Sequence, residues 1–435
     1  MINLILFGTF FIMLLLNIPI AVSLGTSAIL AMLYAHDPFT VISTNVYNGM
    51  AKFLLLAIPF FVLSGNIMAK AGISTRLVNF IDDCVGHRRG GIAIVCVIVA
   101  CFFGAISGSG PATVAALGII LIPAMINRGG FSAPFASAMM ATASSIAIVI
   151  PPSIAFVVYA SITGVSVGDM FMGGILPGIM MGLALVIIIM LEVRKQGLKA
   201  SRERASWGQR ARTFGTAFWG FLVPVIILGG IYGGIFTPTE AAAVSVVYGL
   251  FVGVFIYREV KWKDMGELLV DSGKTTGGIM LIIGSATLFA YICTIHGISQ
   301  AAQGLLLDIA GNKIVFLLIV NVIFLIAGCF VDANSAMYIF IPIMYPVAQQ
   351  LGIDLVHFGV LSTVNLAIGQ VTPPVGVNLF VAIGVADKLQ GLKDKTKVTI
   401  ASMSKAVWPQ IVACIIALLL ITYVPWFSTV LLFGK

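Results

Sequence analysis

The chain has 435 residues, of which 60% are hydrophobic and 9% are charged, and its mean hydropathy is +1.11. An ordinary soluble domain carries about 25% charged residues, so these values exclude that class and predict an all-α polytopic membrane protein. The formal net charge of +8 comes from cations that cluster in short segments between apolar runs. This distribution is typical of cytoplasmic loops, and it argues against a nucleic-acid partner.

Apolar runs near or above the ~20 residues needed to cross a bilayer recur along the chain. No Lys or Arg precedes Lys52, so the first run lacks the basic region of a signal peptide and we expect it to be a retained span. The predicted spans lie near residues 2–18, 20–36, 53–70, 131–165, 169–193, 215–235, 238–257, 276–295, 354–387 and 406–432.

Two further apolar stretches, near 90–127 and 313–350, read as helix, polar tip, helix, and we interpret them as re-entrant hairpins. If each hairpin enters and leaves on one side, all the basic clusters fall on a single face, which is the cytoplasmic face by the positive-inside rule. Both termini are then expected on the opposite side. The clusters are Arg88–Arg89, Arg128, Arg194–Arg212, Arg258–Lys263 and Lys388–Lys405.

Internal symmetry divides the chain into two halves. Pro19 matches Pro238 at an offset of 219 residues, and the diproline at 151–152 matches that at 373–374 at an offset of 222. Each half then holds about five spans and one hairpin, and because five is odd the second repeat must be inverted relative to the first. The predicted domains are residues 1–193, a linker at 194–214, and residues 215–435.

Three segments between the spans are polar. The basic linker is interpreted as a solvated cytoplasmic connection in preference to a lipid-binding patch. Segments 72–86 and 260–274 are amphipathic and too polar to cross, and we expect both to lie along the membrane interface as arms between domains.

The hairpin tips and the diproline breaks interrupt apolar segments in matching positions of the two halves. They run Ser107–Thr113 with Ile150–Ser153, and Asp332–Ala336 with Thr372–Gly376. A helix that ends within the membrane leaves unpaired N–H or C=O groups and a partial charge at each end. Carbonyl ends with hydroxyl and amide oxygens suit a hard monovalent cation, whereas N-termini suit an anionic group. Tight helix packing by small residues is the alternative for a single motif, but two matched pairs favour binding.

Two carboxylates fall within apolar segments. Asp332, at a predicted tip, is either a cation ligand or the N-cap of the following helix. Glu240 follows Thr237-Pro238-Thr239 and fits the capping residue of a first helical turn better than a functional group.

The sequence contains no recognisable catalytic set, so we do not expect an enzyme. Gly273-Lys274-Thr275 imitates the end of a phosphate-binding loop, but Leu268 stands where that motif requires glycine. Any transport would therefore draw on an ion gradient. A channel is disfavoured because no continuous polar path is evident.

Four motifs in order resemble the large membrane subunit of tripartite ATP-independent periplasmic (TRAP) transporters. They are Ile58–Gly65, Ser107–Thr113, Gly234–Ala243 and Thr372–Gly376, and the likeness covers nearly the whole chain. The resemblance implies a multi-pass protein of the bacterial inner membrane, similar to the ion transporter superfamily, with a scaffold domain and a transport domain that works as an elevator. It also implies coupling to Na⁺ and import of an organic acid of the sialic acid or C4-dicarboxylate class.

The same resemblance implies two partners besides the substrate and membrane lipids: a small four-span membrane subunit and a periplasmic substrate-binding protein. Since the chain lacks the four extra N-terminal spans of fused versions, the small subunit is expected to be a separate polypeptide. A stand-alone sodium-coupled carboxylate carrier that needs no binding protein remains the alternative.

The site residues are carried over from the position of the family's sites, where hairpin tips meet broken helices. The sodium candidates are Ser107, Gly108, Ser109, Gly110, Ser145, Asp332, Asn334, Ser335, Gly369, Thr372 and Gly376. The candidates for polar substrate contacts are Ser109, Ser153, Asn334 and Asn378. An arginine is not required, because helix dipoles and hydroxyls can hold a carboxylate.

Overall fold

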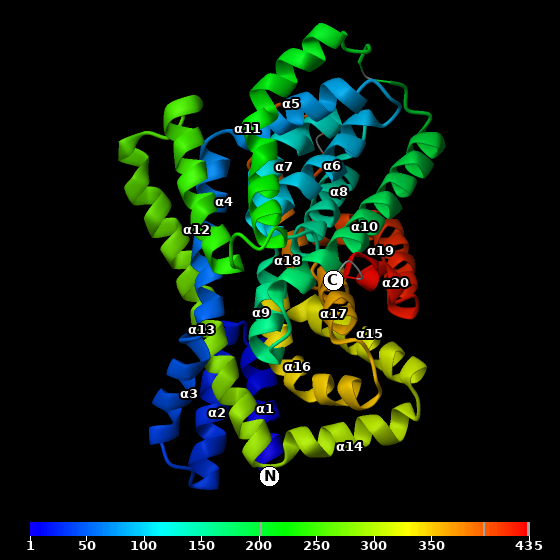
Figure 1. Cartoon of the computed structure of the whole chain (residues 1–435). Helices are drawn as coiled ribbons and strands as arrows, with labels where there is room; N and C mark the ends of the chain where they lie inside the picture. Colours follow the sequence, from blue (N-terminus) through cyan, green and yellow to red (C-terminus); the bar gives the residue numbers. More distant parts are fainter. Residues whose placement is uncertain (201, 395, 433–435) are drawn as a thin grey trace.

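The computed structural model describes residues 1–200, 202–394 and 396–432, and every regular element in these ranges is a helix (Figure 1). Helices satisfy all backbone groups within one segment, as an apolar surrounding requires. Eight helices of the described chain are long and apolar enough to cross a membrane. The predicted all-α polytopic class is therefore confirmed.

The N-terminal half contains ten α-helices, and the last of them runs into the start of the basic linker. Their bounds are α1 (Ile2–Leu15), α2 (Ile20–Ala35), α3 (Thr40–Met50), α4 (Ala57–Lys70), α5 (Ile73–Val85), α6 (Gly91–Ser107), α7 (Gly110–Asn127), α8 (Ala133–Ser145), α9 (Ile154–Thr163) and α10 (Val167–Gln196). Two 3₁₀ turns, η1 (Phe53–Leu56) and η2 (Ile146–Ile148), precede α4 and follow α8.

The C-terminal half has the same kinds of element. They are α11 (Trp207–Tyr232), α12 (Pro238–Phe251) with its π-helical end η3 (Val252–Ile256), η4 (Trp262–Asp264), α13 (Met265–Ile295), α14 (Ile298–Ala310), α15 (Lys313–Phe330), α16 (Ala333–Gln350), α17 (Leu355–Gly369), α18 (Val377–Ala386), α19 (Ile400–Tyr423), α20 (Trp426–Thr429) and η5 (Val430–Leu432). Glu240 bonds the Thr237 N–H at 2.8 Å in a capping box at the start of α12, which confirms its capping role.

The prediction of two interfacial arms was correct for one segment and wrong for the other. Segment 72–86 forms the separate helix α5, but most of segment 260–274 belongs to the 31-residue helix α13. The helix that takes the place equivalent to α5, directly before a hairpin, is α14, and it was not predicted; neither was α3. Small and apolar residues from Gly277 onward allow α13 to continue without a break, so its polar first turns extend a span rather than form an arm.

Each predicted hairpin consists of two helices joined by a two-residue break, at 108–109 and 331–332. In the first, a Cβ placed on Gly129 would lie 2.7 Å from the Ile92 side chain, so the end of α7 returns to the start of α6. In the second, the Phe324 and Phe340 rings, each eight residues from Asp332, have centroids 6.0 Å apart. Both pairs are therefore antiparallel.

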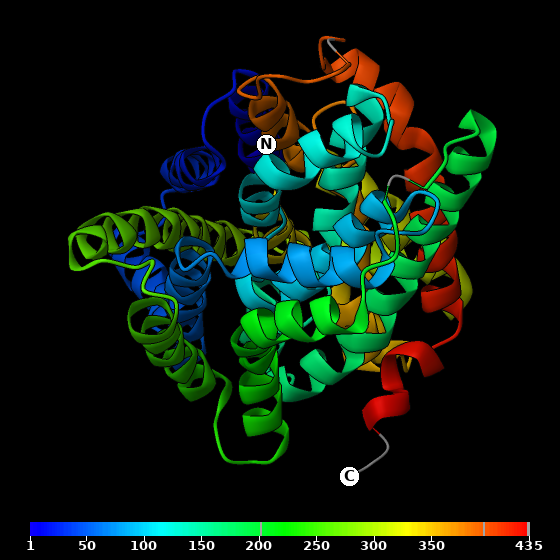
Figure 2. The same ribbon diagram turned by 90° about the horizontal axis from the view of Figure 1, so that it is seen from above.

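The two units of arm and hairpin lie at opposite ends of the molecule. Figure 1 shows α5 with the hairpin α6–α7 in the upper part, and α14 with α15 and α16 in the lower part. In Figure 2, the same molecule is seen from above, with α5 lying across the long helices. The order arm, hairpin, broken helix, long helix occurs once in α5–α10 and once in α14–α19.

The basic segments meet at the upper end of the molecule. Arg128 and Arg202 both bind the buried Asp82 carboxylate, at 2.7 and 2.9 Å, and the loop before α19 bonds the start of α8 through Asp394, whose carboxylate accepts from the Ala133 N–H at 2.8 Å. Hydrogen bonds from the Thr396 hydroxyl and from the N–H groups of Ala133 and Thr396 hold the pKa of Asp394 below its usual range. These contacts join clusters far apart in the sequence at one end, as the topology predicts.

Candidate functional site

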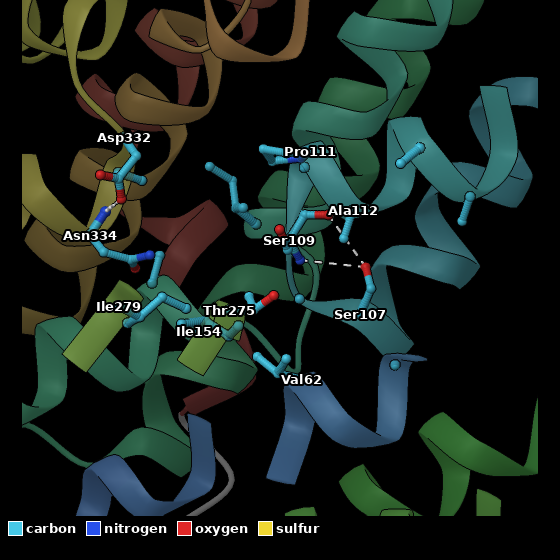
Figure 3. Close-up of a pocket in the computed structure, with 18 of the residues that line it drawn as sticks. Val62, Ser107, Ser109, Pro111, Ala112, Ile154, Thr275, Ile279, Asp332 and Asn334 are labelled. Atoms are coloured by element: carbon cyan, nitrogen blue, oxygen red, sulfur yellow. Dashed lines mark hydrogen bonds between the residues drawn. The ribbon is translucent and has the colours of Figure 1, made fainter. Parts of the chain in front are cut away.

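A cavity of about 540 Å³ lies where the two hairpin tips meet. Residues 107–112 of the first tip and 332–334 of the second face each other across it, and Val62 of α4 with Thr275 and Ile279 of α13 line a third side (Figure 3). The remaining lining is mainly apolar, including Phe103, Ile148 and Ile154. A largely apolar cavity with a few convergent polar groups is the usual form of a small-molecule site.

The first tip presents a bare helix N-terminus to the cavity. Gly108 adopts a left-handed conformation with φ of 60°, which turns the chain from α6 into α7. The Ser107 and Thr113 hydroxyls bond each other at 2.9 Å, and Thr113 also donates to the Ser109 carbonyl at 2.8 Å. Among the described residues, no side chain caps the first turn of α7, which begins at Gly110. Its partial positive charge is therefore available to a ligand.

The second tip carries its own anion. The Asp332 carboxylate accepts from the Asn334 N–H at 2.9 Å and the Ser335 N–H at 3.3 Å, and the Ser335 hydroxyl also donates to it. The capping interpretation of Asp332 is thus confirmed, while Asp332 also lines the cavity. The neighbouring Asn334 lines it as well, and its buried Oδ1 has no hydrogen-bond partner in the described chain.

Each tip is seated on the broken helix of its own half. A Cβ on Gly108 would lie 3.1 Å from the Pro152 carbonyl oxygen, and the Gly376 N–H donates to the Cys329 carbonyl at 3.1 Å. Gly376 itself has φ of 61°. The structure therefore brings the predicted tips and breaks together.

Four predicted site residues with a hydroxyl group are buried or partly buried but do not line the cavity. Ser153 caps α9 by accepting from the Phe156 N–H and donates to the Ile148 carbonyl at 2.5 Å. Ser145 and Thr372 donate within their own helical turns, each at 2.8 Å, to Thr142 and Ile368. Ser335 contacts Asp332. Their hydroxyl protons have local acceptors, although each oxygen retains a lone pair.

Gly369 is placed for packing. A Cβ on Gly369 would lie 2.5 Å from the Gly328 Cα, and one on Gly328 would lie 2.9 Å from the Gly369 Cα. The backbones of α15 and α17 therefore touch directly beside the second tip, as small residues allow in membrane helices.

Gln370 is a cavity residue that the sequence analysis missed. It is 3% exposed, lines the cavity, and its Oε1 has no partner among the described residues. Its place between Gly369 and Thr372, a polar side chain inside a predicted break, is a signal that could have identified it. Asn378 is fully buried, and neither polar atom of its amide has a partner among the described residues. It lies behind Gly110: a Cβ built on Gly110 would be 2.8 Å from Asn378 Nδ2.

Asn66 and Thr275 were also missed, because they lie in helices without a break. The Asn66 amide donates to the Ser272 hydroxyl at 2.8 Å and so joins α4 to α13 beside the cavity. A second cavity of about 330 Å³ shares Asn66 and Ala69 with the first and reaches Lys70, Glu267 and Asp271. Lys70 lies 3.6 Å from Asp264, near the basic end, so the central cavity adjoins a passage toward that end.

Charge is distributed unevenly in the cavity. Among its described lining residues there is no Lys, Arg or His, and the one ionisable side chain is Asp332. A bound anion would have to rely on backbone N–H groups, hydroxyls, amides and any cation held nearby.

A central cavity between two hairpin tips in a helical membrane protein is the arrangement of a membrane transport protein. The family profile described as "Tripartite ATP-independent periplasmic transporter, DctM component" matches residues 7–427. The chain therefore belongs to the large permease subunits of TRAP transporters, which are multi-pass proteins of the bacterial inner membrane.

Similar proteins carry different substrate names. The chain is 38% identical to a C4-dicarboxylate TRAP transporter large permease protein of Rhodobacter capsulatus, over 98% of both chains. It is 41% identical to an isethionate TRAP transporter permease protein of Oleidesulfovibrio alaskensis, over 97% of this chain and 65% of that one. It is 34% identical to a sialic acid large permease protein of Vibrio cholerae, over 89% and 88% of the two chains.

The fold also resembles a solved transporter. The YdaH transporter of Alcanivorax borkumensis superposes with a TM-score of 0.63 at 15% identity, over 91% of this chain and 88% of that one. At this identity the likeness concerns the fold alone.

Proposed function

We propose that this chain is the large membrane subunit of a sodium-coupled transporter that imports an organic acid. The observation that carries the proposal is the single cavity lined by both hairpin tips, one with an uncapped helix N-terminus and the other with a carboxylate. The first suits the anionic group of a substrate and the second suits a cation.

Sodium ions would bind where each tip rests on its own broken helix. Na⁺ prefers hard oxygen ligands, and the two contact zones offer helix-end carbonyls, the Ser107 hydroxyl, the Asp332 carboxylate and the unpartnered Asn334 Oδ1. Ions bound there would also offset the negative charge of an entering acid, since no cationic side chain of the described lining does so. This is a physical reason for substrate and sodium to bind together.

The architecture supports an elevator. We assign α6–α9 and α15–α18 to the transport domain, and α1–α4 with α11–α13 to the scaffold. By internal symmetry, α5–α10 and α14–α19 form the two inverted repeats. The cavity then lies between tips and scaffold, next to a passage toward the basic, cytoplasmic end. At the other end Lys52, before α4, donates to the Ser161 carbonyl of α9 at 2.6 Å and ties the two domains. These contacts correspond to a state open toward the cytoplasm.

The family assignment supports two partners for this chain. We propose a small membrane subunit as a separate polypeptide and a periplasmic binding protein that delivers the acid. The names of the relatives support a substrate among C4-dicarboxylates, sialic acid and related organic anions.

Reconstituted liposomes test the proposal. Uptake of the acid that the binding protein carries should require an inward sodium gradient, the small subunit and the loaded binding protein together. Uptake by this chain alone would favour the stand-alone carrier. Uptake without a sodium gradient would contradict the proposed coupling to sodium.

A further inference from the structure

We propose that the substrate cavity selects a hydroxylated organic monoanion, such as a hydroxycarboxylate or hydroxysulfonate, over a dicarboxylate, and that the amide of Gln370 reads the hydroxyl group. This inference rests on the proposed function, because it narrows the class of acid that the same cavity carries. It is based on the number of free helix N-termini and on unpaired buried amides.

The cavity offers one side to an anionic group, that of the first tip, where α7 and the Ser153-capped α9 both begin. The N-terminus of α7 at Gly110 has no side-chain cap among the described residues and lines the cavity. The opposite N-terminus, that of α16, is already occupied by the Asp332 carboxylate. A second carboxylate on the substrate would therefore face Asp332 instead of free N–H groups, and a sodium ion bound at Asp332 is already balanced by the charge of Asp332 itself. A monoanion fits this arrangement and a dianion does not.

The amides converge on the same helix N-terminus. A Cβ built on Gly110 would lie 3.1 Å from Gln370 Oε1 and 2.8 Å from Asn378 Nδ2, so both side chains end beside the first residue of α7. Gln370 is 3% exposed and Asn378 is fully buried. Gln370 Oε1 and both polar atoms of Asn378 lack a hydrogen-bond partner in the described part of the chain. Buried polar groups are nearly always paired in proteins, and Gln370 lines the cavity, so we infer that a bound ligand pairs its Oε1. Asn378 lies behind Gly110 and outside the lining.

The chemistry of these atoms indicates what the ligand carries. An amide oxygen accepts hydrogen bonds only, so Gln370 Oε1 requires a donor. A carboxylate or sulfonate has no hydrogen to donate at neutral pH, whereas a hydroxyl group both donates and accepts. A substrate whose anionic group lies at the N-terminus of α7, with a hydroxyl one or two carbons away, satisfies the helix end and the amide together. A site built for a hydroxyl group rejects the analogue that lacks it, because the buried amide is then left unpaired.

Binding to the purified protein, in complex with its small subunit where that is needed for stability, tests the proposal. The probes are matched pairs in sodium-containing buffer: 2-hydroxyethanesulfonate with ethanesulfonate, lactate with propionate, and malate with succinate. Calorimetry should show each hydroxylated monoanion binding roughly tenfold or more tightly than its deoxy partner, as expected for one buried hydrogen bond. The dianions should bind more weakly than the monoanions.

The variant Gln370→Met keeps the side-chain volume and removes the amide. It should reduce the affinity ratio within each monoanion pair to about one, mainly by weakening the hydroxylated member. Gln410 provides a matched control, because it is also fully buried with an unpaired Oε1 but lies in α19, outside the cavity lining. Gln410→Met should leave the ratio unchanged. The ratio compares two ligands on one preparation, so it does not depend on the folded fraction; Asn378→Leu gives a second variant.

Three results would overturn the proposal: equal binding of both members of each monoanion pair, tighter binding of succinate or malate than of the monoanions, or equal weakening of both members by Gln370→Met. The last would identify Gln370 as part of a cation site. Failure of the proposed function is distinguishable: anion binding without sodium would refute the coupling and leave the hydroxyl preference intact, whereas no anion binding at all would refute both.

Discussion

Gly110 affects the site through the space it leaves, the helix dipole at its end of α7 and the amides beside it. It begins α7, and its missing side chain leaves room for the ends of Gln370 and Asn378. Asp332 has the complementary role at the other tip, where it supplies a fixed negative charge and a helix cap. One tip is thus ready for an anion and the other already holds one.

Gly110→Ala tests the space at the first tip. The new Cβ would crowd the ends of the Asn378 and Gln370 side chains, which can shift, so we expect normal folding but a loss of uptake of about tenfold or more, equivalent to one displaced buried hydrogen bond. Uptake in liposomes measures the effect. Gly215→Ala in α11, where a Cβ meets nothing within 4 Å, is the control and should transport normally. Equal activity of the two variants would contradict the assignment.

Substitutions of Asp332 separate its charge from its cap. Asp332→Ala removes both, so sodium-driven uptake should be abolished or strongly weakened, and stability should fall by about 1 kcal/mol, while membrane insertion is retained. Asp332→Asn keeps a good N-cap, so its melting temperature should stay near that of the parent while the sodium concentration for half-maximal uptake rises. Unchanged uptake by the alanine variant would remove Asp332 from the site.

At the scale of elements, the important relation is that each hairpin tip rests on the broken helix of its own half. Close backbone approach makes this possible: Gly108 lies against the Pro152 carbonyl, and Gly328 lies against Gly369. The two hairpins differ in how their second helices begin, because α16 is capped by Asp332 and α7 has no described side-chain cap. Similar elements therefore give two chemically different ends.

Gly369→Ala tests the contact between α15 and α17. Its Cβ would be placed 2.5 Å from the Gly328 Cα, and since backbone atoms cannot move aside cheaply, we expect a loss of about 1–3 kcal/mol of stability. Thermal unfolding of the purified protein measures it as a lower melting temperature. Gly384→Ala in the neighbouring α18 meets nothing within 4 Å and should be neutral or stabilising. An unchanged melting temperature for Gly369→Ala would show that the helices are not so tightly packed.

For the whole molecule, the decisive property is the gathering of the basic segments at one end. Arg128, Arg202 and the loop around Asp394 lie in separate parts of the chain, yet they bind partners at the same end. By the positive-inside rule we expect that end to be cytoplasmic. The cavity beside Lys70 would then lie on the side of substrate release.

A topology assay tests this orientation. A reporter fused after Lys435, a position outside the described residues, should report the periplasmic side, and one inserted in the linker near residue 200 should report the cytoplasm, because the cations there are retained on the inner face. A cytoplasmic C-terminus would overturn the orientation and with it the counting of spans. The linker insertion serves as the control for reporter activity.

The membrane class, the two hairpins and their tips could be predicted from the amino-acid sequence, because long apolar runs, glycines and diprolines act locally on the backbone. The motif Thr237-Pro238-Thr239-Glu240 also predicted the capping role of Glu240. It did not separate α14 from its surroundings or recognise that 260–274 continues into α13, since short polar helices and polar helix ends look alike in a sequence.

The polar groups that share a cavity could be identified only from the folded chain. Ser145, Ser153 and Thr372 were reasonable candidates, but their hydroxyls are bonded within their own segments. Gln370 lines the cavity, and its amide oxygen has no partner among the described residues. The physical reason is that a hydrogen bond depends on where both partners lie after helices from the two halves have packed. The spacing of residues along the chain does not contain that information.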